Sequence, residues 1–97
     1  MAVIQFVKFR SGLPDEEVRR LMEARAPQFR AVPGLIQKYY FRDGQTGEHG
    51  GIYVWDSHES MREFRQSEFA RGMGDAYKVE GDKRIEILDV ELTLREE

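Results

Sequence analysis

The residues best suited to bind or transform a small molecule lie close together in the second half of the sequence. Tyr53 and Trp55 are two positions apart, so on a strand they lie on the same face. Each ring carries one hydrogen-bonding group, and this combination suits the wall of a cleft that is partly wet. His58 follows shortly after Trp55, and an imidazole readily takes up or releases a proton near neutral pH. We therefore expect His58 to be the catalytic group of such a cleft.

The segment after residue 58 adds an apolar stripe with a cation beside it. Met61 and Phe64 are three positions apart and so share one face of a helix. Arg65 lies one turn after Met61 and borders this stripe, where a guanidinium could hold an anionic or phenolate group. We expect the substrate to bind at Tyr53, Trp55, Met61, Phe64 and Arg65. The alternative is core packing for the apolar and aromatic residues and a solvated helix face for Arg65.

The sequence contains no recognisable ligand set for a metal or a phosphate. It has no cysteine, and its two histidines, His49 and His58, are not spaced to converge on one ion. Both are expected at solvated positions unless His58 takes part in proton transfer. The glycine pairs near residues 50 and 73 match neither a Walker loop nor a dinucleotide fingerprint. We predict that the protein uses no metal and no cofactor.

Composition narrows the class of protein further. The 97 residues suit one domain, residues 1–97, and the formal net charge of −3 argues against a nucleic-acid partner. The apolar runs are too short to span a bilayer, so no membrane association is expected. No secretory leader precedes the first predicted strand, and cysteine is absent. These features favour a cytoplasmic protein.

Hydrophobic patterning predicts an α+β fold. Strands are expected over residues 2–10, 35–42, 51–55 and 84–94, with helices beginning near Pro14 and at Asp56 or Ser57. The resulting order is βαββαβ. A right-handed crossover and a central hairpin then give a four-stranded antiparallel sheet with both helices on one face. This is the ferredoxin-like arrangement.

Both faces of that sheet are apolar, although the helices can cover only one. The second strand offers Leu35, Tyr39 and Phe41 on one side and Ile36 and Tyr40 on the other. An uncovered aromatic face is unusual for a monomer, and a second copy of the same sheet would cover it. We therefore expect a homodimer, with the end of the long last strand reaching the partner.

The third strand shows the same two-sided character. Ile52 and Val54 suit tight packing between two sheets, so we expect Tyr53 and Trp55 to face the helices. The alternative is the opposite parity, with Tyr53 and Trp55 inside the dimer barrel, and the sequence leaves it open because both faces are apolar.

Three segments resemble a known family. Residues 32–40 (VPGLIQKYY), 50–57 (GGIYVWDS) and 87–90 (ILDV) are similar to the dimeric α+β-barrel superfamily, and within it to small monooxygenase-family proteins near the antibiotic-biosynthesis monooxygenases. The resemblance implies two sheets packed face to face as a barrel in a homodimer. It also implies a ligand cleft in each subunit between the sheet and its helices.

The resemblance leaves more than one activity open. Some members oxidise electron-rich phenols with O₂ and without metal or flavin, and others degrade haem. The haem-degrading members use a Trp on the second helix and a later His as the iron ligand. Here the first position falls on Phe64, and no histidine stands near Met73. Haem chemistry is therefore not favoured.

We predict a cofactor-independent monooxygenase that acts on a hydrophobic aromatic small molecule. In that chemistry the substrate anion itself gives an electron to O₂, while the protein binds the ring and stabilises the anion in a dry pocket. The alternative is a non-catalytic small-molecule-binding or stress-related protein that uses the same cleft. No residue of the sequence separates the two, whereas oxygen uptake with electron-rich phenols would.

Overall fold

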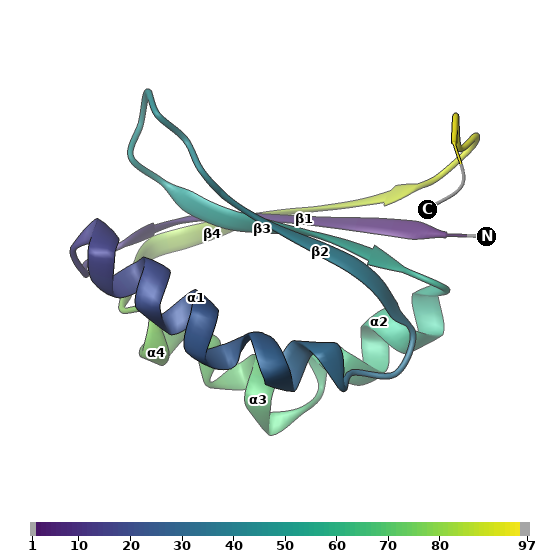
Figure 1. Ribbon diagram of the computed structural model, residues 1–97, viewed down its shortest axis with the longest axis horizontal. Helices are drawn as coiled ribbons and strands as arrows, with labels where there is room; N and C mark the ends of the chain where they lie inside the picture. The colour runs from purple at the N-terminus through teal and green to yellow at the C-terminus, as the bar shows by residue number, and fades with distance from the viewer. Residues whose placement is uncertain (1, 96–97) are drawn as a thin grey trace.

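The computed structural model describes residues 2–95 of the chain. Its elements, in chain order, are β1 (Val3–Ser11), α1 (Asp15–Arg30), β2 (Leu35–Arg42), β3 (His49–Trp55), α2 (His58–Arg65), α3 (Glu68–Arg71), α4 (Met73–Ala76) and β4 (Val79–Asp89). The strands form one antiparallel sheet in the order β2-β3-β1-β4. All four helices lie on the same side of it (Figure 1). The predicted ferredoxin-like fold is confirmed.

Side chains stabilise the first turns of α1 and α2 in different ways. Asp15 and its two acidic neighbours occupy the first turn of α1, where carboxylates stabilise the positive end of the helix dipole. The helix continues past Pro27 to Arg30. Ser57 caps α2 by accepting a hydrogen bond from the backbone N–H of Ser60, so the cap is Ser57 and not Asp56.

A bulge near the start of β2 changes which side chains face the helices. The pairing with β3 slips by one residue between Leu35 and Gln37. As a result Leu35 packs into the helix-side core, whereas Phe41 stacks on Phe6 across the opposite face, 5.6 Å between ring centroids. The predicted grouping of Leu35 with Tyr39 and Phe41 is therefore wrong, because simple alternation does not continue through a bulge.

The last strand lies five residues earlier than predicted. It covers Val79–Asp89, and its first residues, Val79 and Glu80, pair with the end of β1 beyond a second register shift. Gly81, at a φ of 69°, adopts the left-handed conformation that this irregularity requires. Leu92 and Leu94 follow the strand and are exposed. The expected strand reaching residue 94 is therefore corrected.

The core lies between the sheet and the helices in two clusters. The larger cluster consists of Val3, Phe29, Tyr53, Trp55, Met61 and Phe64. The smaller cluster consists of Phe9, Val18, Met22 and Tyr77. Within the described part of the chain, no element covers the opposite face of the sheet. Tyr39 and Leu88 on that face are about half exposed, at 49% and 50%. We refer to it below as the open face.

Gly50 lies where β1 and the side chain of Phe41 leave no room for a Cβ atom. A Cβ at this buried position would overlap the backbone carbonyl oxygen of Val7 and the ring of Phe41. Gly50→Ala should therefore lower the free energy of unfolding by about 1–3 kcal/mol, measured by urea denaturation. Gly44→Ala is the matched control, because a Cβ there meets nothing within 4 Å. Equal effects of the two substitutions would contradict this account.

Candidate functional site

Four of the predicted binding residues form one packed group on the helix side of the sheet. The rings of Tyr53 and Trp55 stack 6.0 Å apart at an interplanar angle of 5°, and Phe64 lies 5.4 Å from Trp55. Met61 completes this group, which belongs to the larger core cluster. Tyr53 and Trp55 thus face the helices, as expected. Trp55, however, has no exposed surface at all.

The polar end of Trp55 is satisfied inside the protein. Its indole Nε1–H donates a hydrogen bond of 2.9 Å to Oε1 of Gln5, and both residues are buried. Gln5 lies on β1, two strand positions from Val3, on the helix-facing side. An unpaired polar group at this depth would cost about 1–3 kcal/mol, so the pair stabilises one arrangement of the core.

A small cavity opens beside this group, between the sheet and the three short helices. We call it the inner cavity; it has a volume of about 270 Å³. Tyr53, Phe64 and Arg65 line it, whereas Trp55 and Met61 lie outside its lining. The wall also includes Gln5 and Tyr77, which sequence reasoning did not assign to the binding set.

The inner cavity combines neutral hydroxyl donors with positive charge. Burial raises the pKa of Tyr53 and of Tyr77, so both phenols remain protonated and can donate hydrogen bonds. Three cationic side chains line the same cavity, namely Arg65, Arg71 and Lys83, and its lining holds no carboxylate. This charge balance favours a ligand that is, or becomes, an anion.

His58 does not line the inner cavity. Its Nε2 lies 2.6 Å from Oδ1 of Asp89, and its side chain is 46% exposed. The pair links the start of α2 to the end of β4. The catalytic role expected of His58 therefore stays a prediction.

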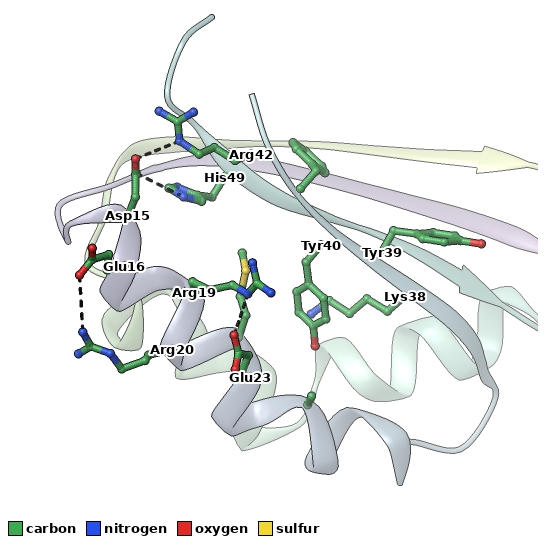
Figure 2. A pocket seen from close by; sticks show the side chains of 13 residues that line it. Asp15, Glu16, Arg19, Arg20, Glu23, Lys38, Tyr39, Tyr40, Arg42 and His49 are labelled. Atoms are coloured by element: carbon green, nitrogen blue, oxygen red, sulfur yellow. Dashed lines mark hydrogen bonds and ion pairs between the residues drawn. The ribbon is translucent and has the colours of Figure 1, made fainter. Parts of the chain in front are cut away.

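A larger cavity lies between α1 and the edge strand β2. We call it the α1–β2 groove, and it has a volume of about 880 Å³. Figure 2 shows its lining side chains. Asp15, at one end, lies 3.0 Å from Arg42 and 3.5 Å from His49. His49 is buried rather than solvated, which corrects the sequence-based expectation, and its burial lowers the pKa of the imidazole.

Lys38 is the unusual residue of the α1–β2 groove. Its Nζ lies 3.3 Å from the ring centroid of Phe29, 4.3 Å from that of Tyr40 and 4.4 Å from that of Tyr53. Burial, together with the positive charge of Arg25, lowers the pKa of Lys38 to about 7. An amine with this pKa is partly neutral at physiological pH and can accept or share a proton.

Sequence reasoning missed Lys38 because a lysine on an edge strand is usually solvated. Its alternation with Tyr40 could have indicated the shared face. Nothing in the sequence, however, showed that Phe29 on α1 would close over the amine.

The described residues contain neither a metal site nor a membrane span. Within residues 2–95, no group of three His, Cys, Asp or Glu side chains is placed to hold a metal ion. None of the helices in the same range has the length and apolarity needed to cross a bilayer.

Comparison with known proteins identifies similar chains. The sequence model of a family described as "Putative mono-oxygenase ydhR" matches residues 4–86. No curated protein matches the chain significantly.

Solved structures share the fold at low sequence identity. SnoaB from Streptomyces nogalater, described as a cofactor-independent oxygenase, has a TM-score of 0.78 at 18% identity, with 98% of each chain covered. Rv0793 from Mycobacterium tuberculosis has a TM-score of 0.78 at 17% identity, covering 98% of this chain and 100% of that one. A protein from Thermobifida fusca described as dimeric and ferredoxin-like has a TM-score of 0.74 at 13% identity, covering 93% and 92%.

The buried amine of Lys38 predicts a distinct pH dependence of stability. Between about pH 7 and pH 10.5 the unfolded chain keeps the proton on Lys38, whereas the folded chain loses it. The free energy of unfolding therefore rises with pH in this window, and below pH 7 the full cost of burying the charge remains. The free energy of unfolding of Lys38→Met should exceed that of the wild type by the largest amount near about pH 6. This difference should shrink by roughly 1 kcal/mol per pH unit above pH 7.

Urea denaturation of both proteins from about pH 6 to about pH 9 measures this difference, since other titrations cancel between them. Lys78→Met is the matched control, because Lys78 is exposed and stays hydrated in both states. A difference between wild type and Lys38→Met that does not change with pH would show that Lys38 is not buried as described.

Proposed function

The chain belongs to the ydhR mono-oxygenase family, and we propose that it is a cofactor-independent monooxygenase acting on a hydrophobic aromatic small molecule in the inner cavity. The description of SnoaB, which has the same fold, as a cofactor-independent oxygenase supports this reaction class.

The observation that carries the proposal is the chemistry of the inner cavity. Its lining contains the aromatic rings of Tyr53 and Phe64, two protonated tyrosine hydroxyls and three cationic side chains, and it contains no carboxylate. An aromatic substrate that ionises to an enolate or phenolate is stabilised by such fixed donors and charges. The volume of about 270 Å³ lies just below the usual range for ligand pockets, which favours a substrate of one or two rings.

The reaction needs no electrons beyond those of the substrate. Loss of a proton from an acidic C–H or O–H gives an anion that transfers an electron to O₂. Recombination forms a C–O bond, and breaking the O–O bond completes the step. For a methylene carbon, four electrons leave the substrate: one oxygen atom becomes the new carbonyl oxygen and the other leaves as water. The protein's part is to bind, orient and exclude water.

We assign the predicted binding residues to two roles. Tyr53, Phe64 and Arg65 would contact the substrate, with Arg65 as the partner of the developing anion. Trp55 and Met61 lie behind them and would hold these side chains in place through packing and the bond from Trp55 to Gln5. The proton acceptor predicted from sequence is His58.

A non-catalytic binding protein is the second candidate. The same cavity would hold an aromatic anion equally well without any reaction. Binding of electron-rich phenols without oxygen consumption would favour this candidate.

We also propose that two chains pair through their open faces as a homodimer. That face carries Ile4, Phe6, Phe41, Ile52, Val54 and Leu88, and no described element covers it. The Thermobifida fusca protein described as dimeric supports this assembly. Two sheets packed in this way would form the barrel expected from the sequence.

Oxygen uptake tests the proposed function. The purified protein, without added metal, flavin or reductant, should consume O₂ with at least one electron-rich phenol, quinol or anthrone of a substrate panel. Arg65→Ala should lower kcat/KM by about tenfold to a hundredfold, since it removes a charge-assisted hydrogen bond to the anion. Arg62→Ala, on the same helix but outside the cavity lining, is the matched control.

The same assay addresses His58. The sequence predicts that His58→Ala loses turnover while substrate binding persists. Tight binding across the panel with no oxygen consumption would exclude the enzyme in favour of the binding protein.

Light scattering tests the assembly. At micromolar concentration the wild type should have about twice the chain mass of 11.4 kDa. Leu88→Arg adds a charge to the open face at a side chain already 50% exposed, so it should shift the protein to monomers without unfolding it. Ala24→Arg on the exposed surface of α1 should leave the mass unchanged. A folded wild-type monomer would overturn the proposed dimer.

A further inference from the structure

The α1–β2 groove has the size of a ligand site and is separate from the inner cavity. Its volume of about 880 Å³ falls within the roughly 300–1,000 Å³ typical of small-molecule pockets. The linings of the two cavities share no residue. Three consecutive aromatic residues of β2 line the groove, namely Tyr39, Tyr40 and Phe41. Of these, Tyr40 directs its ring toward α1, whereas the rings of Tyr39 and Phe41 lie on the open face (Figure 2). The ring of Tyr40 offers a flat surface to a planar ligand.

The acidic side chains of the groove already have cationic partners. Glu23 lies 2.8 Å from Arg19, and Glu16 lies 3.9 Å from Arg20 (Figure 2). Asp15 is shared by Arg42 and His49, as described above.

Of the cationic side chains that line the groove, Lys38 is the one that takes part in none of these ion pairs. Among the described residues, no carboxylate lies within ion-pair distance of its amine.

The surroundings of Lys38 increase the need for an anion. The ionisable groups facing it are Arg25 on α1, Tyr40 on its own strand and Tyr53 on β3, and none of them is acidic near neutral pH. The buried Nε of Arg25 has no hydrogen-bond partner in the described part of the chain. Two neighbouring buried cations without a counter-ion repel each other, and a bound anion would relieve this repulsion.

We propose that the α1–β2 groove binds an acidic phenol, with its ring against the ring of Tyr40 and its ionised oxygen paired with the Lys38 amine. When the phenol enters protonated and the amine is neutral, the O–H bond breaks and the proton moves to the lone pair of Nζ. The product is an ammonium–phenolate pair, with no change of oxidation state. The site does not depend on the proposed oxygenase reaction.

A phenol suits this site because of its shape and acidity together. Its planar ring can pack against the ring of Tyr40, which lies on the same side of the sheet as Lys38. Its hydroxyl can share a proton with an amine whose charged form is disfavoured by burial. The aromatic rings around Lys38 also stabilise the ammonium once the proton has moved.

Titration with 4-nitrophenol tests this inference, because only its phenolate absorbs in the visible range. At a pH where free nitrophenol is partly ionised, the wild type should increase the phenolate absorbance on binding. In a protein that also carries Arg65→Ala, which removes the cation proposed to hold phenolates in the inner cavity, Lys38→Met should weaken nitrophenol binding at least tenfold and abolish this increase. 4-Nitroanisole, which cannot ionise, should change in affinity by less than twofold between the two proteins.

Two further variants locate the signal. Lys78→Met, a control for charge removal at an exposed lysine, should bind nitrophenol like the wild type. Arg65→Ala alone, which alters the inner cavity, should keep the phenolate increase that depends on Lys38. Failure of the wild type to bind nitrophenolate would overturn the proposal. A loss of nitrophenol affinity in Arg65→Ala that equals or exceeds the loss caused by Lys38→Met would also overturn the proposal. Oxygen uptake plays no part in this test, so the proposed function and this site can fail independently.

Discussion

The ring of Phe29 is the contact on which the interior of this protein depends. Phe29 projects from α1 and packs against side chains of β2, β3, α2 and α3, with ring centroids 5.0–6.3 Å apart, at Tyr40, Tyr53, Phe64 and Phe69. It lies two residues after Pro27, near the end of a helix that continues through the proline. Because this one ring contacts side chains of four other elements, it fixes the position of α1 over the sheet, and α1 forms one wall of the α1–β2 groove.

The distribution of charge in this layer follows from that packing. Aromatic rings exclude water around Lys38 and Arg25, while the acidic residues of α1 lie on its exposed side and pair with surface arginines. The inner cavity therefore has cations and tyrosine hydroxyls in its lining without a carboxylate, and the carboxylates of the α1–β2 groove pair with cations other than Lys38. Positive charge without a counter-ion favours an anionic ligand in each cavity.

The two faces of the sheet serve different purposes although both are apolar. The helix-facing side chains are packed in the core, and Gln5 with Trp55 forms its buried polar pair. On the open face, Phe6 and Phe41 stack on each other with no layer of the described chain above them. The fold thus separates the two cavities, which lie on the helix side of the sheet, from the surface that we propose for the second copy.

The sequence by itself determined the order of the elements, the sheet topology that follows from it and the shared face of Tyr53 and Trp55. These features depend on local periodicity, which a single strand or helix carries in its own residues. Only the tertiary structure decided the remainder. The bulge after Leu35 reset the alternation of β2, and the second register shift moved β4 to Val79–Asp89. The burial of Lys38 and the lining of the α1–β2 groove depend on how closely α1 approaches the sheet, and the inner cavity depends on how the short helices pack on it. Each cavity is bounded by segments distant in sequence, and no local pattern encodes their separation.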